Sequence, residues 1–247
     1  MGLLKRVSRH GLVGTAKLIP VNLWSLAKHS TRQARLARQR DRKFDRSMGI
    51  NTSGIIPLGA LGVDSPSAAS ATYYQPVGIE AFTEMTALLP SDVSEFSFVD
   101  YGSGKGRALI LAAQRPFKEV VGIEFSKKLH IQAEKNIAAR QIYSRCKTVT
   151  SIFMDAADYD PPSGPVVVFL SNPFGADMVE RVLYRVEKKH QTPGADAYLF
   201  YWHPVHQKTV IARPFWRQIA SGRTWAAFKG LGVLDTGRAC GGDDIKI

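Results

Sequence analysis

The chain contains 247 residues, of which 45% are hydrophobic and 22% are charged. These values are ordinary for a globular protein, and the length suits one sizeable core, alone or with an appendage. The two cysteines, Cys146 and Cys240, have no metal-ligand spacing around them. They argue against a zinc site or a disulfide framework and favour a reducing compartment, the cytoplasm. Because no apolar run reaches the ~18 residues of a membrane-spanning helix, no transmembrane segment is expected.

Positive charge is concentrated near the N-terminus. The formal net charge is +12, and residues 1–46 contain 12 Lys and Arg against 2 Asp and Glu. We interpret residues 1–46 as a basic arm, with a helix expected from Leu23 to Arg46. Such an arm can contact the phosphates of nucleic acid or an anionic membrane surface, or it can be a solvated tail. Its lack of acids before Asp41 also resembles an organelle transit peptide, which would apply to a eukaryotic protein.

Residues 47–95 are interpreted as an ordered loop and a helix that pack on the core. The loop is rich in Gly, Ser, Pro and Ala, but it contains too many apolar residues for a free linker. A helix is expected from Gly78 to Leu89, because Pro90 would end it.

Residues 96–247 alternate strand patterns with helical patterns and form the expected core. Val166 to Leu170 is β-branched or apolar throughout, which is typical of a central parallel strand. This alternation predicts an α/β fold with a mostly parallel sheet, right-handed crossovers and helices on both faces. The expected strands are residues 96–101, 120–124, 148–154, 166–170, 195–202, 215–219 and 225–229.

The first of these strands is followed by three glycines at every second position, Gly102, Gly104 and Gly106, and then by a helical pattern. Glycines at this place let the chain take φ > 0 and let a ligand lie against bare backbone. The dinucleotide pattern G-x-G-x-x-G is not met, because its third glycine is replaced by Arg107. Asp100, two residues before the turn, would repel a pyrophosphate but suit a cationic ligand.

The pattern Asp-x-Gly-x-Gly-x-Gly after a strand resembles the first motif of the class I S-adenosylmethionine (SAM)-dependent methyltransferases. The resemblance covers roughly residues 70–235. It implies a Rossmann-like sheet of seven strands, closed by an antiparallel strand pair, and SAM as the cofactor, with no metal. The implied cofactor-binding residues are Asp100, Gly102, Ser103, Gly104, Gly106, Glu124 and Asp155. In this family a segment before the first strand often closes over the cofactor, and Tyr74 and Gln75 could do this or could pack on the surface.

Two acids follow the second and third strands. Glu124 lies 24 residues after Asp100, where a carboxylate can accept hydrogen bonds from both hydroxyls of a ribose. The alternative is an ordinary surface acid at the end of a strand. Asp155 resembles the acid of the family that binds the adenine amino group, although acidic loops are common and Asp158 and Asp160 lie nearby.

The fourth strand ends in Ser171-Asn172-Pro173-Phe174. This resembles the Asp/Asn-Pro-Pro-aromatic motif of methyltransferases that act on amino groups, with Phe174 where the second proline would stand. The resemblance implies that Asn172 directs an acceptor amine and that Phe174 packs against it. Phe174 could instead make an ordinary core contact, which is the more common role of such a side chain. Asn172 as a helix cap, followed by Pro173 at the first helical position, would explain the same residues. The resemblance to the amino-group motif favours a protein or nucleic acid over a small molecule as methyl acceptor.

Two other classes of protein stay open. An oxidoreductase with a nicotinamide cofactor would also use a glycine turn, but the missing third glycine and Asp100 argue against it. A nucleic-acid-binding protein with a non-catalytic Rossmann-like core would fit the basic arm, whereas the acids at the strand ends favour an enzyme.

Overall fold

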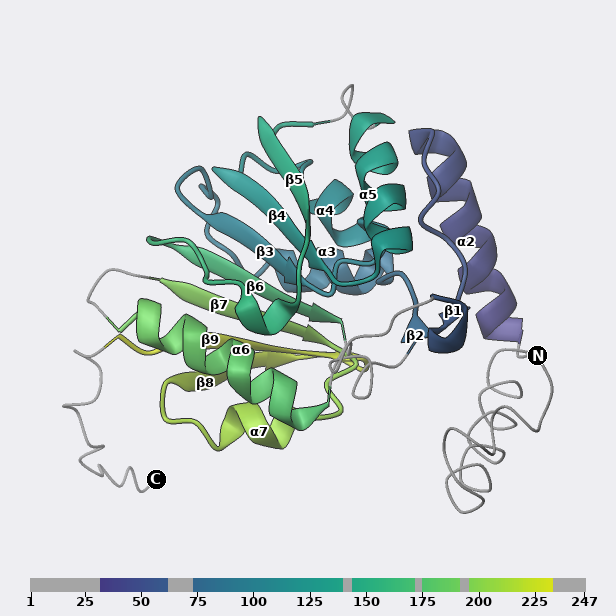
Figure 1. Ribbon diagram of the computed structural model, residues 1–247. Helices are drawn as coiled ribbons and strands as arrows, with labels where there is room; N and C mark the ends of the chain where they lie inside the picture. Colours follow the sequence, from purple (N-terminus) through teal and green to yellow (C-terminus); the bar gives the residue numbers. More distant parts are fainter. Residues whose placement is uncertain (1–31, 62–72, 140–143, 172–174, 192–195, 233–247) are drawn as a thin grey trace, which may run out of the picture. The chain divides into compact units, whose positions relative to one another are not determined.

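The computed structural model describes residues 32–61, 73–139, 144–171, 175–191 and 196–232 (Figure 1). Most of the basic arm, as well as Asn172 and Phe174, lies outside the described residues. The chain divides into two units, Met1–Phe44 and Asp45–Ile247. Helix α2 (Arg32–Met48) therefore begins in the first unit, and its last turn belongs to the second. None of the described helices is long and apolar enough to cross a membrane.

The second unit is built on one sheet of seven strands in the order β5-β4-β3-β6-β7-β9-β8. β3 to β7 pair in parallel, whereas β9 is antiparallel to both of its neighbours, β7 and β8. This confirms the expected sheet and its closing antiparallel pair. The strands are β3 (Ser97–Tyr101), β4 (Glu119–Glu124), β5 (Thr148–Phe153), β6 (Val166–Ser171), β7 (Ala197–Trp202), β8 (Trp216–Ser221) and β9 (Trp225–Gly230).

The strand order places a topological switch point between β3 and β6. From β3 the chain proceeds outward to β4 and β5, and it then returns to the other side of β3 to form β6 and β7. In open α/β sheets, the crevice at the carboxyl ends of the two strands at this point is where ligands bind. The glycine turn follows β3 directly, so it lies at this crevice.

Helices cover both faces of the sheet, as expected (Figure 1). On one face, Phe82 of α3 packs against Phe98 and Phe169, with ring centroids 5.9 and 5.7 Å apart. On the other face, Val168 of β6 shares a buried cluster with Val179 of α6. The helices of this unit are α3 (Ile79–Thr86), α4 (Arg107–Ala112), α5 (Lys127–Ala139), α6 (Ala176–Lys189) and α7 (Gln207–Ile211).

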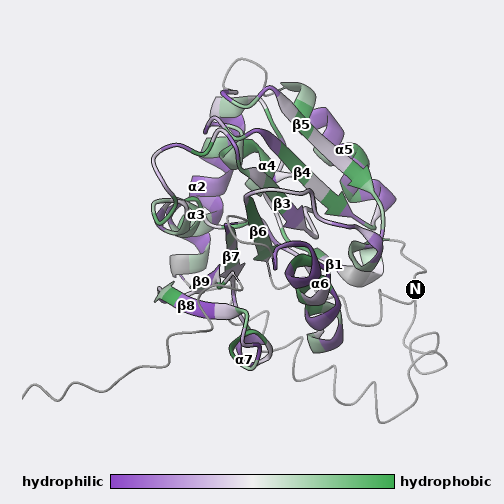
Figure 2. Ribbon diagram, turned by 90° about the vertical axis from the view of Figure 1, so that its left-hand side faces the viewer, coloured by the Kyte–Doolittle hydropathy of each residue, from purple (hydrophilic) through white to green (hydrophobic). Residues whose placement is uncertain are grey.

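The core follows from the apolar pattern of the central strands. Every residue of β3 and β7 is buried, and β6 is buried except at its last residue. These strands carry much of the green, apolar colour in Figure 2, whereas α6 is purple on the side that faces away from the sheet. Parallel strands that are buried on both faces need such continuous apolar runs, because neither face meets water.

A second, two-stranded sheet lies in the segment that precedes the core. It pairs β1 (Ile56–Pro57) with β2 (Tyr73–Tyr74) in an antiparallel register. Two short 3-10 helices, η1 (Leu58–Ala60) and η4 (Ala156–Asp158), complete the described elements. The sequence patterns did not predict β1 and β2, because two-residue strands have no periodicity to detect.

Candidate functional site

The turn after β3 has the conformation that its glycines predict. Gly102, Gly104 and Gly106 have φ values of 84°, 57° and 82°, which side chains with a Cβ rarely adopt. The N–H groups of Gly102 and Ser103 donate to the Ile123 oxygen at 2.8 and 3.0 Å, which anchors the turn to β4. The turn therefore presents bare backbone at the switch point of the sheet.

Glu124, the last residue of β4, connects two turns. Its Oε2 accepts a hydrogen bond from the Gly104 N–H at 2.7 Å, and its Oε1 accepts one from the Ser126 N–H at 2.7 Å. The side chain is 3% exposed, so the alternative of an ordinary surface acid is wrong. Burial raises the pKa of this carboxyl to about 7, although the backbone N–H groups oppose the shift.

Asp100 lies inside the sheet, next to the glycine turn, and is 2% exposed. Its Oδ1 has no hydrogen-bond partner among the described residues. Burial, and then the nearby charge of Glu124, raises the pKa of Asp100 well above its ordinary value. A buried oxygen without a partner costs about 1–3 kcal/mol, so a ligand that brings a donor or a positive charge would be stabilised here.

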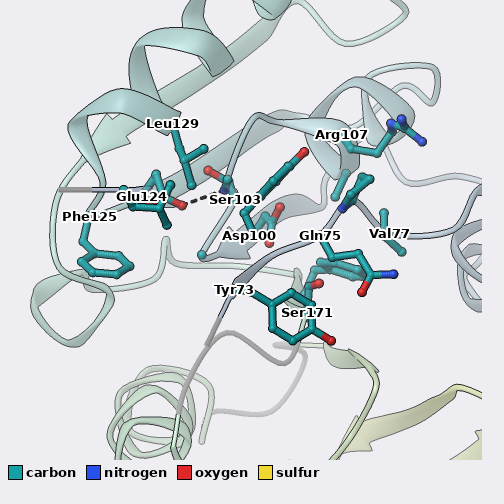
Figure 3. A pocket seen from close by; sticks show the side chains of 17 residues that line it. Tyr73, Gln75, Val77, Asp100, Ser103, Arg107, Glu124, Phe125, Leu129 and Ser171 are labelled. Carbon is teal, nitrogen blue, oxygen red and sulfur yellow. Dashed lines mark hydrogen bonds between the residues drawn. The ribbon is translucent and has the colours of Figure 1, made fainter. Parts of the chain in front are cut away.

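These groups line one pocket, shown in Figure 3. Ser103 lies between Asp100 and Glu124 in that view, and Tyr73 and Ser171 lie across the opening from them. The cavity has a volume of about 60 Å³, which holds a few water molecules and is smaller than the roughly 300–1,000 Å³ of most small-molecule sites. The lining residues come mainly from β2 and the loop after it, the ends of β3, β4 and β6, the glycine turn, and helices α4 and α5.

Tyr74 explains why the cavity is small. Its ring lies against the glycine turn, and a Cβ at Gly104 would be 2.3 Å from a carbon of that ring. Tyr74 is buried, and both Tyr74 and Gln75 line the pocket. Both residues therefore lie at the site, and the alternative that they pack on the surface away from it is wrong.

Asp155 and Ser126 lie just after the ends of β5 and β4. Asp155 follows β5 but is not among the residues that line the pocket; its Oδ1 accepts from the Ala157 N–H at 3.0 Å and caps η4. Ser126 precedes α5, and its hydroxyl has no hydrogen-bond partner among the described residues, so its side chain does not cap that helix.

The residues proposed for catalysis, Asn172 and Phe174, lie outside the described residues. Ser171, which directly precedes them at the end of β6, lines the pocket. Helix α6 begins at Ala176 with Gly175 as its N-cap. The interpretation of Asn172 as a helix cap followed by Pro173 falls on residues outside the described part of the chain.

Sequence reasoning missed part of the pocket. Ser171 and Phe125 each lie at or next to the end of a strand, which was the available signal, and Tyr73 belongs to a strand too short to predict. Leu129, a buried residue of α5, also lines the pocket.

No protein-family model and no curated protein matches the chain. Similar solved structures include an RNA methyltransferase from Salinibacter ruber in complex with S-adenosyl-L-homocysteine, at 20% identity, 63% of this chain, 92% of that chain and a TM-score of 0.46. A putative methylase from Haemophilus influenzae has 21% identity over 64% of this chain and 92% of that chain, with a TM-score of 0.48. A predicted N6-adenine-specific DNA methylase from Listeria monocytogenes has 14% identity over 71% of this chain and 55% of that chain, with a TM-score of 0.48.

Similarity at this level of identity concerns the fold alone. The sheet of seven strands with its closing antiparallel pair, in which the glycine turn follows β3, is the fold that the resemblance to class I SAM-dependent methyltransferases implies.

Proposed function

We propose that this protein is a SAM-dependent methyltransferase. The observation that supports this most is the pair of buried carboxyl groups, Asp100 and Glu124, on either side of a turn of bare backbone at the switch point of the sheet. SAM supplies an electrophilic methyl group on a sulfonium, and it also carries an ammonium group. Two carboxyl groups suit such a cation, and Asp100, next to the turn, would repel the pyrophosphate of a dinucleotide.

In this proposal, different residues at the ends of the strands bind different parts of SAM. Asp100, with its unpartnered oxygen, faces a cationic group, and the turn from Gly102 to Gly106, which includes Ser103, holds the methionine part against bare backbone. Glu124 uses its remaining lone pairs for the ribose hydroxyls, because each carboxylate oxygen can accept more than one hydrogen bond. Asp155 is proposed for the adenine amino group, which requires its carboxylate to serve both η4 and the ligand.

The acceptor is proposed to be an amine nitrogen of a protein or a nucleic acid. The sequence Ser171-Asn172-Pro173-Phe174 supports this, and Ser171 lines the pocket. An amine attacks through its lone pair, so a group that accepts its N–H bond, such as the Asn172 amide oxygen, can aim it. The arm, residues 1–46, is proposed to bring a polyanionic substrate or surface close, as its 12 Lys and Arg allow.

Transfer of a labelled methyl group tests this function. We expect the purified protein, given SAM labelled in its methyl group, to label the protein, RNA or DNA fraction of a cell extract. Gly104→Val should abolish labelling, because a side chain there strains the turn and meets the Tyr74 ring. Gly164→Val is the matched control, since Gly164 also has positive φ, 93°, but has open space around it and is not among the residues that line the pocket.

A folded Gly104→Val protein that labels as well as the wild type would contradict this use of the turn. Label confined to small molecules would contradict the proposed acceptor, and no label in any fraction would favour a non-catalytic core.

A further inference from the structure

Arg107, the first residue of α4, directly follows the glycine turn, is buried and also lines the pocket. It is 1% exposed, and a buried guanidinium needs acceptors and a counter-charge. Its Nε donates to the hydroxyl of Thr52, and its Nη2 donates to Oδ1 of Asp45 at 3.1 Å. These partners lie 55 and 62 residues earlier in the chain. The start of α4, next to the turn, is therefore bonded to a segment outside the core pattern.

The carboxylate of Asp45 organises that segment. Besides Arg107, it accepts from the Thr52 hydroxyl at 2.6 Å, and from the backbone N–H groups of Thr52 and Ser53 at 2.8 and 2.6 Å. Asp45 and Thr52 are buried. A buried carboxylate with four donors has its main acceptor sites filled. The segment of residues 45–53, which is the last turn of α2 and the loop after it, is therefore fixed in one conformation around this carboxylate.

The same loop is tied to the glycine turn and to α5. Lys105 of the turn donates from Nζ to the Ser53 oxygen at 2.8 Å. The Asn136 Nδ2 of α5 donates to the main-chain oxygens of Asn51 and Lys105 at 3.0 and 2.8 Å. The Asn136 Oδ1 accepts from the Asn51 N–H at 2.9 Å. These contacts give the loop a defined place beside the turn.

The loop in turn holds Tyr74. The main-chain oxygen of Thr52 accepts a hydrogen bond from the Tyr74 hydroxyl at 2.5 Å, and the ring of Tyr74 lies against Gly104. The ring thus occupies the space over the bare backbone, which leaves a cavity of only about 60 Å³. A ligand of nucleoside size that lies on Gly104 has to displace this ring.

We propose that Asp45 and Thr52 are positioning residues of the cofactor site and that Tyr74 is the residue they position. The bond between Tyr74 and Thr52 keeps the ring on Gly104 until the ligand displaces it. This inference rests on the proposed function, because the ligand it names is SAM. Only the fraction of molecules with the ring displaced binds the ligand, so the apparent dissociation constant is raised by the inverse of that fraction.

Tyr74→Phe tests the inference with the smallest change. It keeps the ring and removes only the hydroxyl that bonds Thr52. We expect this variant to bind SAM more tightly than the wild type, by about two- to tenfold, the effect of losing one ordinary hydrogen bond that favours the closed ring. Tyr73→Phe is the matched control, because Tyr73 lines the same pocket but lies 45% exposed, outside the contacts that join residues 45–53 to the glycine turn.

A second variant, Thr52→Val, tests the contacts that the Thr52 hydroxyl makes. It keeps the main-chain oxygen but loses the hydroxyl that Asp45 and Arg107 share. We expect tighter SAM binding here too, and no further gain when it is combined with Tyr74→Phe, because both changes release the same ring. If the effects of the two changes on SAM affinity add up, they act independently, which would argue against release of the same ring. If Thr52→Val does not fold, the comparison of Tyr74→Phe with Tyr73→Phe decides alone.

Calorimetric titration with SAM measures all of these affinities and does not depend on turnover. Unchanged or weaker SAM binding in Tyr74→Phe, or equal tightening in Tyr73→Phe, would overturn the inference and leave the proposed function intact. A wild-type protein that binds no SAM would overturn the proposed function, and the role of Tyr74 with it.

Discussion

Glu124 links the chemistry of the site to pH. Burial raises its pKa to about 7 from 4.5 in the unfolded chain. The folded protein therefore holds a proton that the unfolded chain has released between these two values. The stability that this proton contributes is fully present below the unfolded pKa and is lost as pH rises through about 7. The buried Asp100, whose pKa is also raised, acts in the same direction.

Glu124→Gln should remove part of this dependence on pH. For the wild-type protein without ligand, we expect the free energy of unfolding to fall by up to about 3 kcal/mol from this residue between about pH 5 and about pH 8. A side chain that cannot ionise should flatten that fall. Chemical denaturation of both proteins across this range measures the difference, and parallel curves for the two would show that Glu124 does not titrate as described.

The proposed role of Asn172 can be tested directly by mutation. If its amide oxygen aims the acceptor amine, Asn172→Ala should lower kcat by about 10²-fold or more, with SAM affinity nearly unchanged. Asn172→Ser should lose activity similarly, because serine offers no amide oxygen. Since α6 is capped at Gly175, neither change should reduce the stability of that helix. A fully active Asn172→Ser enzyme would remove Asn172 from the mechanism.

At the scale of elements, the sequence patterns predicted every strand of the large sheet within two residues at each end. The β-branched run at β6 and the alternating strand and helix patterns were strong local signals. Helix ends were less accurate: α3 ends at Thr86, because the N–H groups of Leu88 and Leu89 turn back to residues three earlier. The contacts of Asp45 with Arg107 span 62 residues, and no local pattern encodes such a pair.

Phe82 packs α3 against the sheet, so replacing it should lower the stability of the protein. The side chain is 3% exposed and packs against two aromatic rings of β3 and β6. We expect Phe82→Ala to lower the free energy of unfolding by about 3–5 kcal/mol. Leu88→Ala, at a residue that is 37% exposed just after the same helix, should cost far less. Equal losses in the two variants would contradict the described packing.

At the scale of the whole molecule, charge is separated from the core. Residues 47–247 contain 21 Lys and Arg against 19 Asp and Glu, so nearly all of the net charge of +12 belongs to residues 1–46. In the described part of this arm, α2 exposes Arg32, Arg35, Arg40, Arg42 and Lys43. A surface of this composition favours polyanions through the release of counterions.

Replacing those five residues of α2 by Gln should weaken binding to RNA or to anionic vesicles. Glutamine keeps the helix, because its helix propensity is close to that of Lys and Arg, and Asp45 is left in place. We expect the residual binding to depend less steeply on salt, and SAM affinity to stay unchanged. Fluorescence anisotropy over a salt series measures the binding to RNA or vesicles and its dependence on salt. Binding that is unaffected by salt in the wild type would contradict the proposed role of the arm.

Calorimetric titration of the whole chain with SAM, and separately with NADH, tests the central claim most directly. The buried carboxyl groups of Asp100 and Glu124 beside the glycine turn predict saturable binding of SAM to one site per chain. Asp100 also predicts no binding of NADH, because the pyrophosphate would face this acid next to the turn. Binding of NADH, or no heat with SAM, would contradict the assignment of this pocket to a cationic methyl donor.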